Sequence, residues 1–409
     1  RFRLPLLAAA LVPLGAAGQA GSAEGWPQLL GPRRDGSYAG EIARSWPREG
    51  PKGTWQKEAG AGFAGPAVAE GRVFIFHRTG QEEKLDCLEA DTGKLVWSSG
   101  YPATYRDDFG FDPGPRAVPA VAEGRVFTYG ADGVISAIDA RNGTTLWRID
   151  AKTEFNSRKG FFGRVCSPLV TGGLVLLNIG GGSAGIVALE AATGKLRWQA
   201  TRDEASYSSP TLAVFDGRTN ALFLTRDLFV SLDPQSGKIA FEYPFGPAER
   251  SSVTAATPLV EGDRVFLSAC YGAGSTALRM EDGKPVKIWA SEDRMLNHYA
   301  TCVHRNGLLF GFDGRQEQRP AFSCVDWKTG RLLWRKDNFG AGTVIVANDL
   351  LLMLLESGEL VLAEASGEGY QELQRAQVAG ADTRAYPALA GGFLYARDKN
   401  KLICLDLRK

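Results

Sequence analysis

Short apolar runs separated by turn-forming residues fill most of the chain. One example is the run from Ile135 to Asp139, which leads into the turn at Asn142-Gly143 and then into a second run that ends in Trp147. An Asn-Gly pair favours a tight turn with a left-handed residue, so this stretch predicts a β-hairpin. Beyond the first residues, no segment of helix length has apolar positions every three to four residues. The pattern therefore predicts an all-β protein built from many short strands.

The hairpin pattern recurs along the chain. Each copy has a glycine in the turn, and most copies have a Trp or Phe a few positions later that ends the second strand. The repeat glycines are Gly93, Gly143, Gly194, Gly237, Gly283, Gly330 and Gly367. Six steps separate the first glycine from the last, which gives about 46 residues per step, a length typical of the blades of a β-propeller.

A second repeated phrase lies upstream of most of these hairpins. It consists of small or apolar residues around a Pro, followed by another apolar strand, as in Val118-Pro-Ala-Val121 before Arg125-Val-Phe127. Each copy predicts the first two strands of a blade. Together with the hairpin, it gives four short antiparallel strands per repeat.

The last repeat lacks its final strand. In the first repeat the turn glycine follows Cys87 by six positions, but the chain ends five positions after the equivalent Cys404. At the other end, Gly53-Thr-Trp-Gln56 carries a Trp without a hairpin of its own. Joining the two ends of the chain in one sheet protects exposed strand edges. The sequence therefore predicts a single eight-bladed β-propeller of four-stranded antiparallel blades over residues 53–409, with the last blade closed by the N-terminal strand.

The first residues predict an export signal. Arg1 and Arg3 precede an apolar run that reaches Gly15, and small residues follow up to Ala23, as in a secretory signal peptide. We expect a signal peptide at residues 1–23 and an N-terminal extension at residues 24–52. The mature protein is then periplasmic or secreted and has no transmembrane segment after signal removal.

Net charge and cysteine positions argue against nucleic-acid binding and against a disulfide framework. Lys plus Arg number 47 and Asp plus Glu number 46, so the net charge of +1 provides no general attraction for nucleic acid. Cys87, Cys324 and Cys404 occupy one equivalent position in three different blades, too far apart for bridging. We expect the six cysteines to act mainly as small buried apolar residues.

The repeat resembles a known family. Asp91-Thr-Gly-Lys94 followed by Trp97, and its copies, are similar to the pyrroloquinoline-quinone-like (PQQ-like) repeat of the quinoprotein alcohol dehydrogenase-like superfamily. That family includes quinoprotein alcohol dehydrogenases and the propeller lipoprotein of bacterial outer-membrane assembly. The segments Trp26 to Gly36 and Asn297 to Val303 also resemble exported bacterial proteins named only for this repeat. The resemblance implies a propeller fold, whereas an activity has to be argued from a site.

Aligning the blades on their Pro position places one residue of each blade near the mouth of the central channel. These residues, three positions before the Pro or its equivalent, are Phe63, Arg116, Val165, Tyr207, Ala255, Tyr299, Ala341 and Arg384. The residue before each of them gives a second tier, which includes Arg164 and His298. Arg315 and Glu317 lie in a polar loop expected near His298. The predicted ligand-binding mouth comprises Arg116, Arg164, Tyr207, His298, Tyr299, Arg384, Arg315 and Glu317.

This set predicts an electropositive, aromatic mouth. Arginine binds carboxylates through two parallel hydrogen bonds, and aromatic rings offer a stacking surface. The alternative is that the arginines pair with loop acids, namely Asp107, Asp108, Glu154 or Glu317, and only hold loops in place.

The sequence favours a binding or scaffolding module over an enzyme. The resemblance to quinoprotein dehydrogenases implies a vicinal disulfide, acidic metal ligands and an Asp base, but the chain has no Cys-Cys pair and no matching set of ligands. No catalytic residue, metal site or cofactor is therefore predicted. The alternatives are a PQQ-dependent dehydrogenase with calcium, and a hydrolase or lyase of acidic sugars that uses His298 and Tyr299. We expect a monomer that binds a protein, an anionic small molecule or a glycan.

Overall fold

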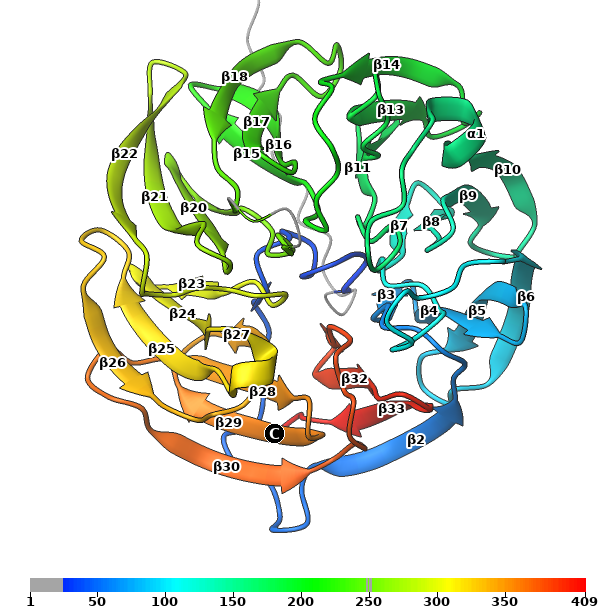
Figure 1. Ribbon diagram of the computed structural model, residues 1–409. Coiled ribbons are helices and arrows are strands. Elements are labelled where there is room, and N and C mark those ends of the chain that lie inside the picture. Colours follow the sequence, from blue (N-terminus) through cyan, green and yellow to red (C-terminus); the bar gives the residue numbers. More distant parts are fainter. Residues whose placement is uncertain (1–24, 248, 250–251) are drawn as a thin grey trace, which may run out of the picture.

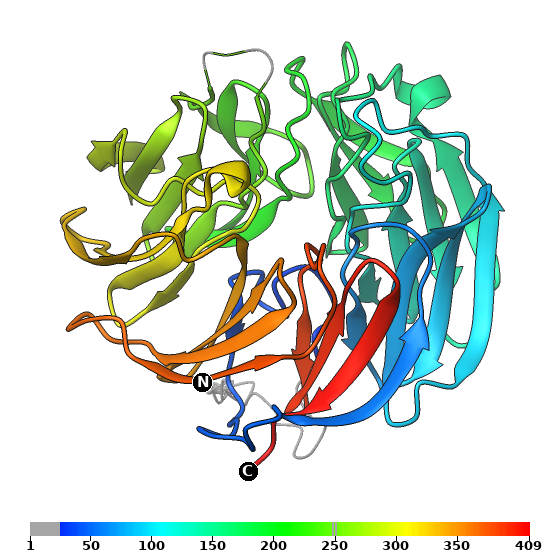
Figure 2. The ribbon, with the colours of Figure 1, turned by 60° about the horizontal axis from the view of Figure 1, so that its bottom comes forward.

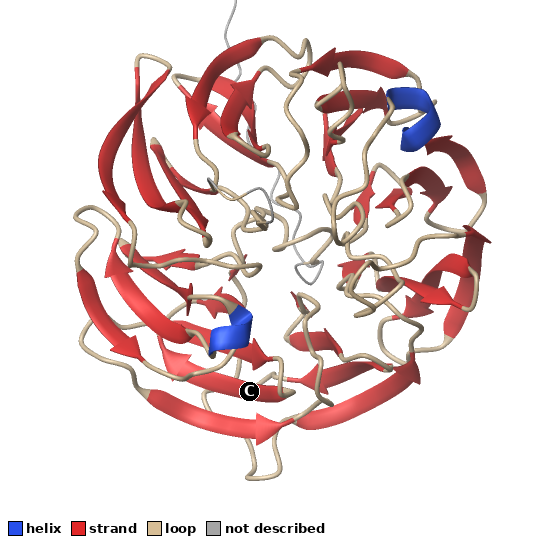
Figure 3. Cartoon of the chain, in the orientation of Figure 1, coloured by secondary structure: helices blue, strands red, loops and turns tan. Residues whose placement is uncertain are grey.

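Eight β-sheets stand as blades around a central axis and form a closed ring (Figure 1). The computed structural model describes residues 25–247, 249 and 252–409, so the predicted signal peptide lies outside the described residues. Within each blade four strands pair antiparallel, from a first strand near the axis to a fourth at the outer rim. Two short helical segments are the only helices in the described chain (Figure 3). The predicted eight-bladed all-β propeller is confirmed.

The first four blades follow one another along the chain. Blade 1 contains β3 (Ala67–Ala69), β4 (Arg72–Thr79), β5 (Glu82–Glu89) and β6 (Leu95–Pro102). Blade 2 contains β7 (Ala120–Ala122), β8 (Arg125–Tyr129), β9 (Val134–Asp139) and β10 (Thr145–Asp150), followed by helix α1 (Ala151–Phe155). Blade 3 contains β11 (Leu169–Thr171), β12 (Leu174–Asn178), β13 (Ile186–Glu190) and β14 (Leu196–Ala200). Blade 4 contains β15 (Thr211–Phe215), β16 (Arg218–Leu224), β17 (Leu228–Leu232) and β18 (Ile239–Pro244).

The remaining blades complete the ring. Blade 5 contains β19 (Leu259–Glu261), β20 (Arg264–Ala269), β21 (Gly274–Glu281) and β22 (Lys284–Ser291). Blade 6 contains β23 (Val303–Arg305), β24 (Leu308–Asp313), β25 (Ala321–Asp326) and β26 (Leu332–Lys336), with the 3₁₀ helix η1 (Gln316–Gln318) between β24 and β25. Blade 7 contains β27 (Gly342–Ala347), β28 (Leu350–Leu355), β29 (Glu359–Glu364) and β30 (Glu372–Gln377). Blade 8 contains β31 (Ala388–Ala390), β32 (Phe393–Arg397), β33 (Lys401–Asp406) and β2 (Lys52–Glu58).

Blade 8 joins the two ends of the chain. The N-terminal β2 pairs antiparallel with the C-terminal β33, and Trp55 lies opposite Cys404. Figure 2 shows the two strands side by side, β33 in red and β2 in blue. The predicted closure of the last blade is therefore confirmed, and the closing strand begins at Lys52.

The segment that precedes β2 packs across one face of the ring. Trp26 forms a backbone bridge with Val68 of β3, and its side chain is almost fully buried. The two-residue strand β1 (Ser37–Tyr38) pairs parallel with β27, so blade 7 has five strands where the sequence predicted four. A two-residue strand with one apolar side chain has no period that a sequence pattern can detect.

A buried arginine fixes the same segment to blade 3. Arg34 donates from its guanidinium to the carbonyl oxygens of Ser167 and Pro168, 3.2 and 2.9 Å away. Burial of a guanidinium is costly unless acceptors meet its N–H groups, and these two carbonyls together with the Gln28 side chain accept from Nη1 and Nη2. No helix in the described part of the chain has the length and apolar character needed to cross a membrane.

An indole packed on a glycine joins most neighbouring blades. Trp97 of β6 covers the turn of the next blade so closely that a Cβ added to Gly143 would lie 2.7 Å from its ring. The Trp97 Nε1 donates to the carbonyl oxygen of Ala140 in that turn, at 3.1 Å. The same bond from Nε1 to a carbonyl of the following blade occurs for Trp55, Trp147, Trp198, Trp289 and Trp334.

Three blade interfaces lack the packing of an indole on a glycine. Between blades 6 and 7, a Cβ added to Gly367 would meet Leu333 and Leu308. The Trp334 Nε1 still donates to the Ser366 carbonyl at this interface. Blade 4 has Phe241 at the Trp position, and a Cβ added to Gly283, the turn glycine of blade 5, would meet nothing within 4 Å. Blade 7 has Gln374 at the Trp position, and blade 8 has no hairpin turn to receive an indole because its last two strands come from opposite ends of the chain.

We predict that Gly143→Ala destabilises the fold more than Gly283→Ala. Both glycines have a positive φ, +77° and +72°, so both substitutions carry the left-handed penalty of about 1–2 kcal/mol. Only Gly143→Ala also drives a methyl group into an indole, which adds about 1–3 kcal/mol. Chemical denaturation of the two variants beside the wild type measures the difference. Equal losses of unfolding free energy would show that the indole contact contributes nothing beyond the turn conformation.

Candidate ligand-binding site

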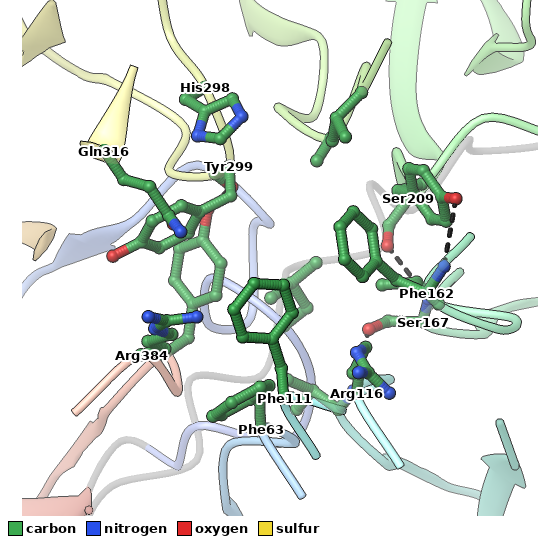
Figure 4. Close-up of a pocket in the computed structure, with 17 residues that line it drawn as sticks. Phe63, Phe111, Arg116, Phe162, Ser167, Ser209, His298, Tyr299, Gln316 and Arg384 are labelled. Atoms are coloured by element: carbon green, nitrogen blue, oxygen red, sulfur yellow. Dashed lines mark hydrogen bonds between the residues drawn. The ribbon is translucent and has the colours of Figure 1, made fainter. Parts of the chain in front are cut away.

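The loops that lead into the innermost strands enclose a cavity on the channel axis (Figure 4). Its volume is about 180 Å³. Leu29 of the N-terminal segment belongs to its lining and packs in a small apolar cluster with Val118 and Tyr386, which line it too. The N-terminal segment therefore closes one end of the channel, and we call the resulting cavity the cup.

The residues predicted by aligning the blades converge on the cup. Seven of the eight residues in the first tier line it, namely Phe63, Arg116, Val165, Tyr207, Ala255, Tyr299 and Arg384. The eighth, Ala341, lines a small neighbouring cavity. Side chains alternate in direction along extended backbone, so the second tier faces away: Arg164, Ser206 and Thr254 line a separate pocket. His298 is the second-tier residue that lines the cup.

Aromatic rings from two long loops form one wall of the cup. Phe111 lies 6.3 Å from Phe162, and Phe162 lies 5.8 Å from Tyr207, measured between ring centroids. Phe111 is 53% exposed although it packs on these rings. Sequence reasoning missed Phe111 and Phe162 because both lie in loops outside the repeat. The available signal was the clustering of large apolar residues in loops, where polar residues are usual.

Arg116 is held firmly within the wall. Its guanidinium forms an ion pair with Asp107, both side chains being less than a tenth exposed, and donates to the carbonyl oxygens of Asp112 and Gly114 at 3.0 Å. The same guanidinium lies 5.6 Å from the centroid of the Phe63 ring. The positive charge of Arg116 is therefore compensated, and the pairing with Asp107 is the one considered in the alternative hypothesis.

Arg384 is more open to the cup. Its Nε lies 3.3 Å from Glu356 Oε1, and its side chain is 23% exposed. The guanidinium lies 5.5 Å from the centroid of Phe63 and 5.8 Å from that of Phe111. Burial raises the pKa of Glu356, and Arg384 opposes this rise. Arg384 thus combines a partly compensated positive charge with two ring faces.

His298 and Tyr299 contribute neutral groups. Burial lowers the pKa of His298 to about 4, so its imidazole carries no charge near neutral pH. The His298 Nε2 lies 3.0 Å from the hydroxyl of Tyr271. Burial raises the pKa of Tyr299, and its phenol stays protonated. At neutral pH these two residues offer hydrogen bonding and apolar surface rather than charge.

The other three predicted residues lie outside the cup. Arg164 donates from Nε to the Ser157 hydroxyl at 2.9 Å, and it lines the separate pocket. Arg315 and Glu317 form an ion pair with each other around η1, and the Arg315 guanidinium lies 4.4 Å from the Tyr271 ring centroid. Gln316, between them, is the residue of this segment that lines the cup.

The residues present do not fit a quinone held over a metal ion. Across the described ranges, no group of three or more His, Cys, Asp or Glu side chains could hold a metal. All six cysteines are buried and unpaired. A vicinal disulfide and acidic metal ligands, which the resemblance to quinoprotein dehydrogenases implies, are thus not provided by these side chains.

Comparison with known proteins agrees with the fold. A family model of PQQ-like repeats, described as outer membrane protein assembly factor BamB, matches residues 39–200 and 157–336. The chain belongs to this family. BamB of Xanthomonas campestris pv. campestris is 28% identical over 255 residues, which cover 60% of this chain and 61% of that protein. Quinohemoprotein alcohol dehydrogenase ADH-IIG of Pseudomonas putida is 25% identical over 185 residues, 42% of this chain and 25% of the enzyme. The chain thus spans less than two thirds of either relative.

Solved structures of related proteins share the propeller. BamB from Moraxella catarrhalis superposes with a TM-score of 0.64 at 15% identity, over 87% of this chain and 99% of that structure. A europium-containing methanol dehydrogenase superposes with a TM-score of 0.71 at 13% identity, over 93% of this chain and 89% of that enzyme. At these identities the likeness concerns the fold alone.

We predict that His298→Gln reduces the acid sensitivity of the protein. The folded-state pKa of His298, about 4, lies below the ordinary value of 6.5, so the unfolded chain binds the proton more readily. Stability is therefore complete above pH 6.5 and falls as the pH approaches 4, by about 2 kcal/mol at pH 5 for this residue. Denaturation of wild type and variant at pH 7 and pH 5 measures the difference. An unchanged pH dependence would contradict a neutral buried His298.

Proposed function

We propose that the chain is an exported binding scaffold that holds an exposed segment of a partner protein in the cup. Two observations support this class of function. The family to which the chain belongs is described as an outer membrane protein assembly factor. The first residues have the pattern of a secretory signal, which supports a periplasmic or secreted location.

The shape and lining of the cup carry the proposal. Leu29 of the N-terminal segment belongs to its lining. Phe63, Phe111 and Phe162 provide apolar ring surface around it (Figure 4). A ring-lined cavity that is closed at one end suits one large apolar side chain, whose burial contributes about 1.5–3 kcal/mol. Such a pocket anchors a binding segment in the way that aromatic anchors fill pockets at protein interfaces.

Arg384 gives the cup a preference for a negatively charged group on the ligand. It is the more exposed of the two guanidinium groups that line the cup, and Phe63 and Phe111 lie next to it. A guanidinium in a partly desolvated site binds a carboxylate through charge-assisted hydrogen bonds. The proposed ligand is therefore a peptide segment that carries a large apolar residue beside an Asp or Glu.

Other functions have less support. No observation favours the PQQ-dependent dehydrogenase or the hydrolase or lyase of acidic sugars, and the described residues include no group of three or more His, Cys, Asp or Glu that could hold a metal. A glycan partner for the cup and a monomeric state stay predictions.

The test uses a random-peptide display library selected on the immobilised full chain. We expect enrichment of peptides with an aromatic or large aliphatic residue next to an acidic one. Phe111→Ser and Arg384→Gln should each weaken an enriched peptide by at least about tenfold in fluorescence anisotropy, since each removes one of the two recognition elements.

Matched controls lie on other faces of the ring. Val214→Ser removes an apolar side chain that is 63% exposed, next to the N-terminal segment. Arg408→Gln removes a guanidinium that pairs with Asp406 and lies 4.3 Å from the Phe393 ring centroid. Both variants should bind as the wild type does. Failure to enrich any peptide, or equal weakening by cup and control variants, would refute the cup as a peptide site.

A further inference from the structure

A second pocket lies beside the cup, among the loops of blades 2, 3 and 4. Its volume is about 360 Å³, and its lining includes Tyr129, Arg158, Arg164, Asn178 and Ser206. We call it the side pocket. Tyr207 lines both cavities, and its hydroxyl accepts a hydrogen bond from the Phe162 amide at 3.2 Å. This contact forms part of a wall between an aromatic cup and a polar side pocket.

The side pocket is basic. Its lining has four basic residues, Arg158, Lys159, Arg164 and Arg226, and two acidic ones, Asp108 and Glu204. Lys159 is paired with Asp108, whereas Arg158 is 75% exposed and reaches Glu204 only at 3.7 Å. The excess of positive charge favours an anionic ligand, and Arg158 is the basic residue that can turn toward it at least cost.

Two polar atoms in the lining lack a hydrogen-bond partner within the protein. They are the hydroxyl of Tyr129 and the Oδ1 of Asn178, in side chains that are 1% and 2% exposed. The neighbouring Ser157 hydroxyl donates to the Ile179 carbonyl at 2.9 Å and accepts from Arg164 Nε at 2.9 Å. It keeps one lone pair that the Tyr129 hydroxyl hydrogen can use, which leaves the Tyr129 oxygen as an acceptor for a ligand. Buried polar atoms normally have partners, so these two mark the positions where a ligand's polar groups would be recognised.

The chemistry of these atoms defines the ligand. Asn178 donates from Nδ2 to the Leu224 carbonyl at 3.0 Å, which leaves its Oδ1 as an acceptor for a ligand hydroxyl. The Tyr129 oxygen can accept from a second hydroxyl. A carboxylate at the entrance would meet Arg158.

We propose that the side pocket binds a small polyhydroxylated carboxylate, such as a sugar acid. The hydroxyl groups lie against Tyr129 and Asn178, and the carboxylate faces Arg158. This binding site is independent of the peptide site proposed for the cup. The two cavities differ in polarity, and different substitutions alter each of them.

The experiment is isothermal titration of the full chain with sodium D-glucuronate. We expect saturable binding of one molecule per chain, with D-glucose and succinate each binding at least about tenfold more weakly, since glucose lacks the carboxylate and succinate lacks the hydroxyls. Binding of succinate as tight as that of glucuronate would overturn hydroxyl recognition. The absence of saturable glucuronate binding would overturn the proposal.

Two variants locate the site. Tyr129→Phe deletes one unpartnered hydroxyl and should weaken glucuronate by roughly three- to tenfold without a change in melting temperature. Arg158→Glu alters an exposed side chain and should weaken it by at least about fivefold. Arg197→Glu, an exposed residue on β14 of the same region of chain, is the matched charge control and should bind normally.

The cup variant Phe111→Ser separates this proposal from the proposed function. It should weaken peptide binding and leave glucuronate binding unchanged, whereas Tyr129→Phe should weaken glucuronate binding and leave peptide binding unchanged. Loss of glucuronate binding in Phe111→Ser with retention in both side-pocket variants would place the ligand in the cup and overturn the assignment.

Discussion

The indole of one blade pressed on the turn glycine of the next is the contact on which the closed ring depends. Each such Trp packs one ring face on a glycine and donates its N–H to a carbonyl of the same turn. The contact therefore combines buried apolar area with a directional hydrogen bond. The glycine is required for two reasons: its φ is positive, and a methyl group at this position would occupy the place of the indole. Blades that are individually marginal sheets become one structure through this repeated contact.

Ring closure and the N-terminal segment together turn a channel into a cup. A ring of eight blades leaves an open axis, and the segment with Trp26, Leu29 and Arg34 closes one end of it through backbone pairing, apolar packing and a buried guanidinium. The alternation of side chains before the innermost strands then separates two environments. One tier faces the axis and the other faces the loops between blades, which yields an aromatic cup beside a polar pocket.

Much of the fold was predictable because its information is periodic. The turn glycines, the Trp positions and the unpaired Trp55 specify eight blades and the closure of the last, and the Pro alignment finds seven residues of the cup. Features that do not repeat from blade to blade could not be predicted in this way. Phe111 and Phe162 lie in loops without a repeat, β1 is two residues long, and the pairing of Arg116 with Asp107 depends on how one loop folds back. A tier of arginines therefore suggested more net charge than the folded cup retains.

The loop that carries the exposed rings is rigid at its base, which bears on how the cup can bind. The buried Arg78 donates to the carbonyl oxygens of Ala103, Tyr105 and Pro113, at 2.9, 2.6 and 3.1 Å, and so ties both ends of this loop to blade 1. Arg116 adds its bond to Gly114 in the same loop. A loop held by main-chain acceptors loses little further freedom when a ligand reaches Phe111, so less of the binding free energy is spent on ordering. Arg78 and Arg116 thus act as supports for aromatic surface, and Arg384 is the arginine that we propose meets the charge of a ligand.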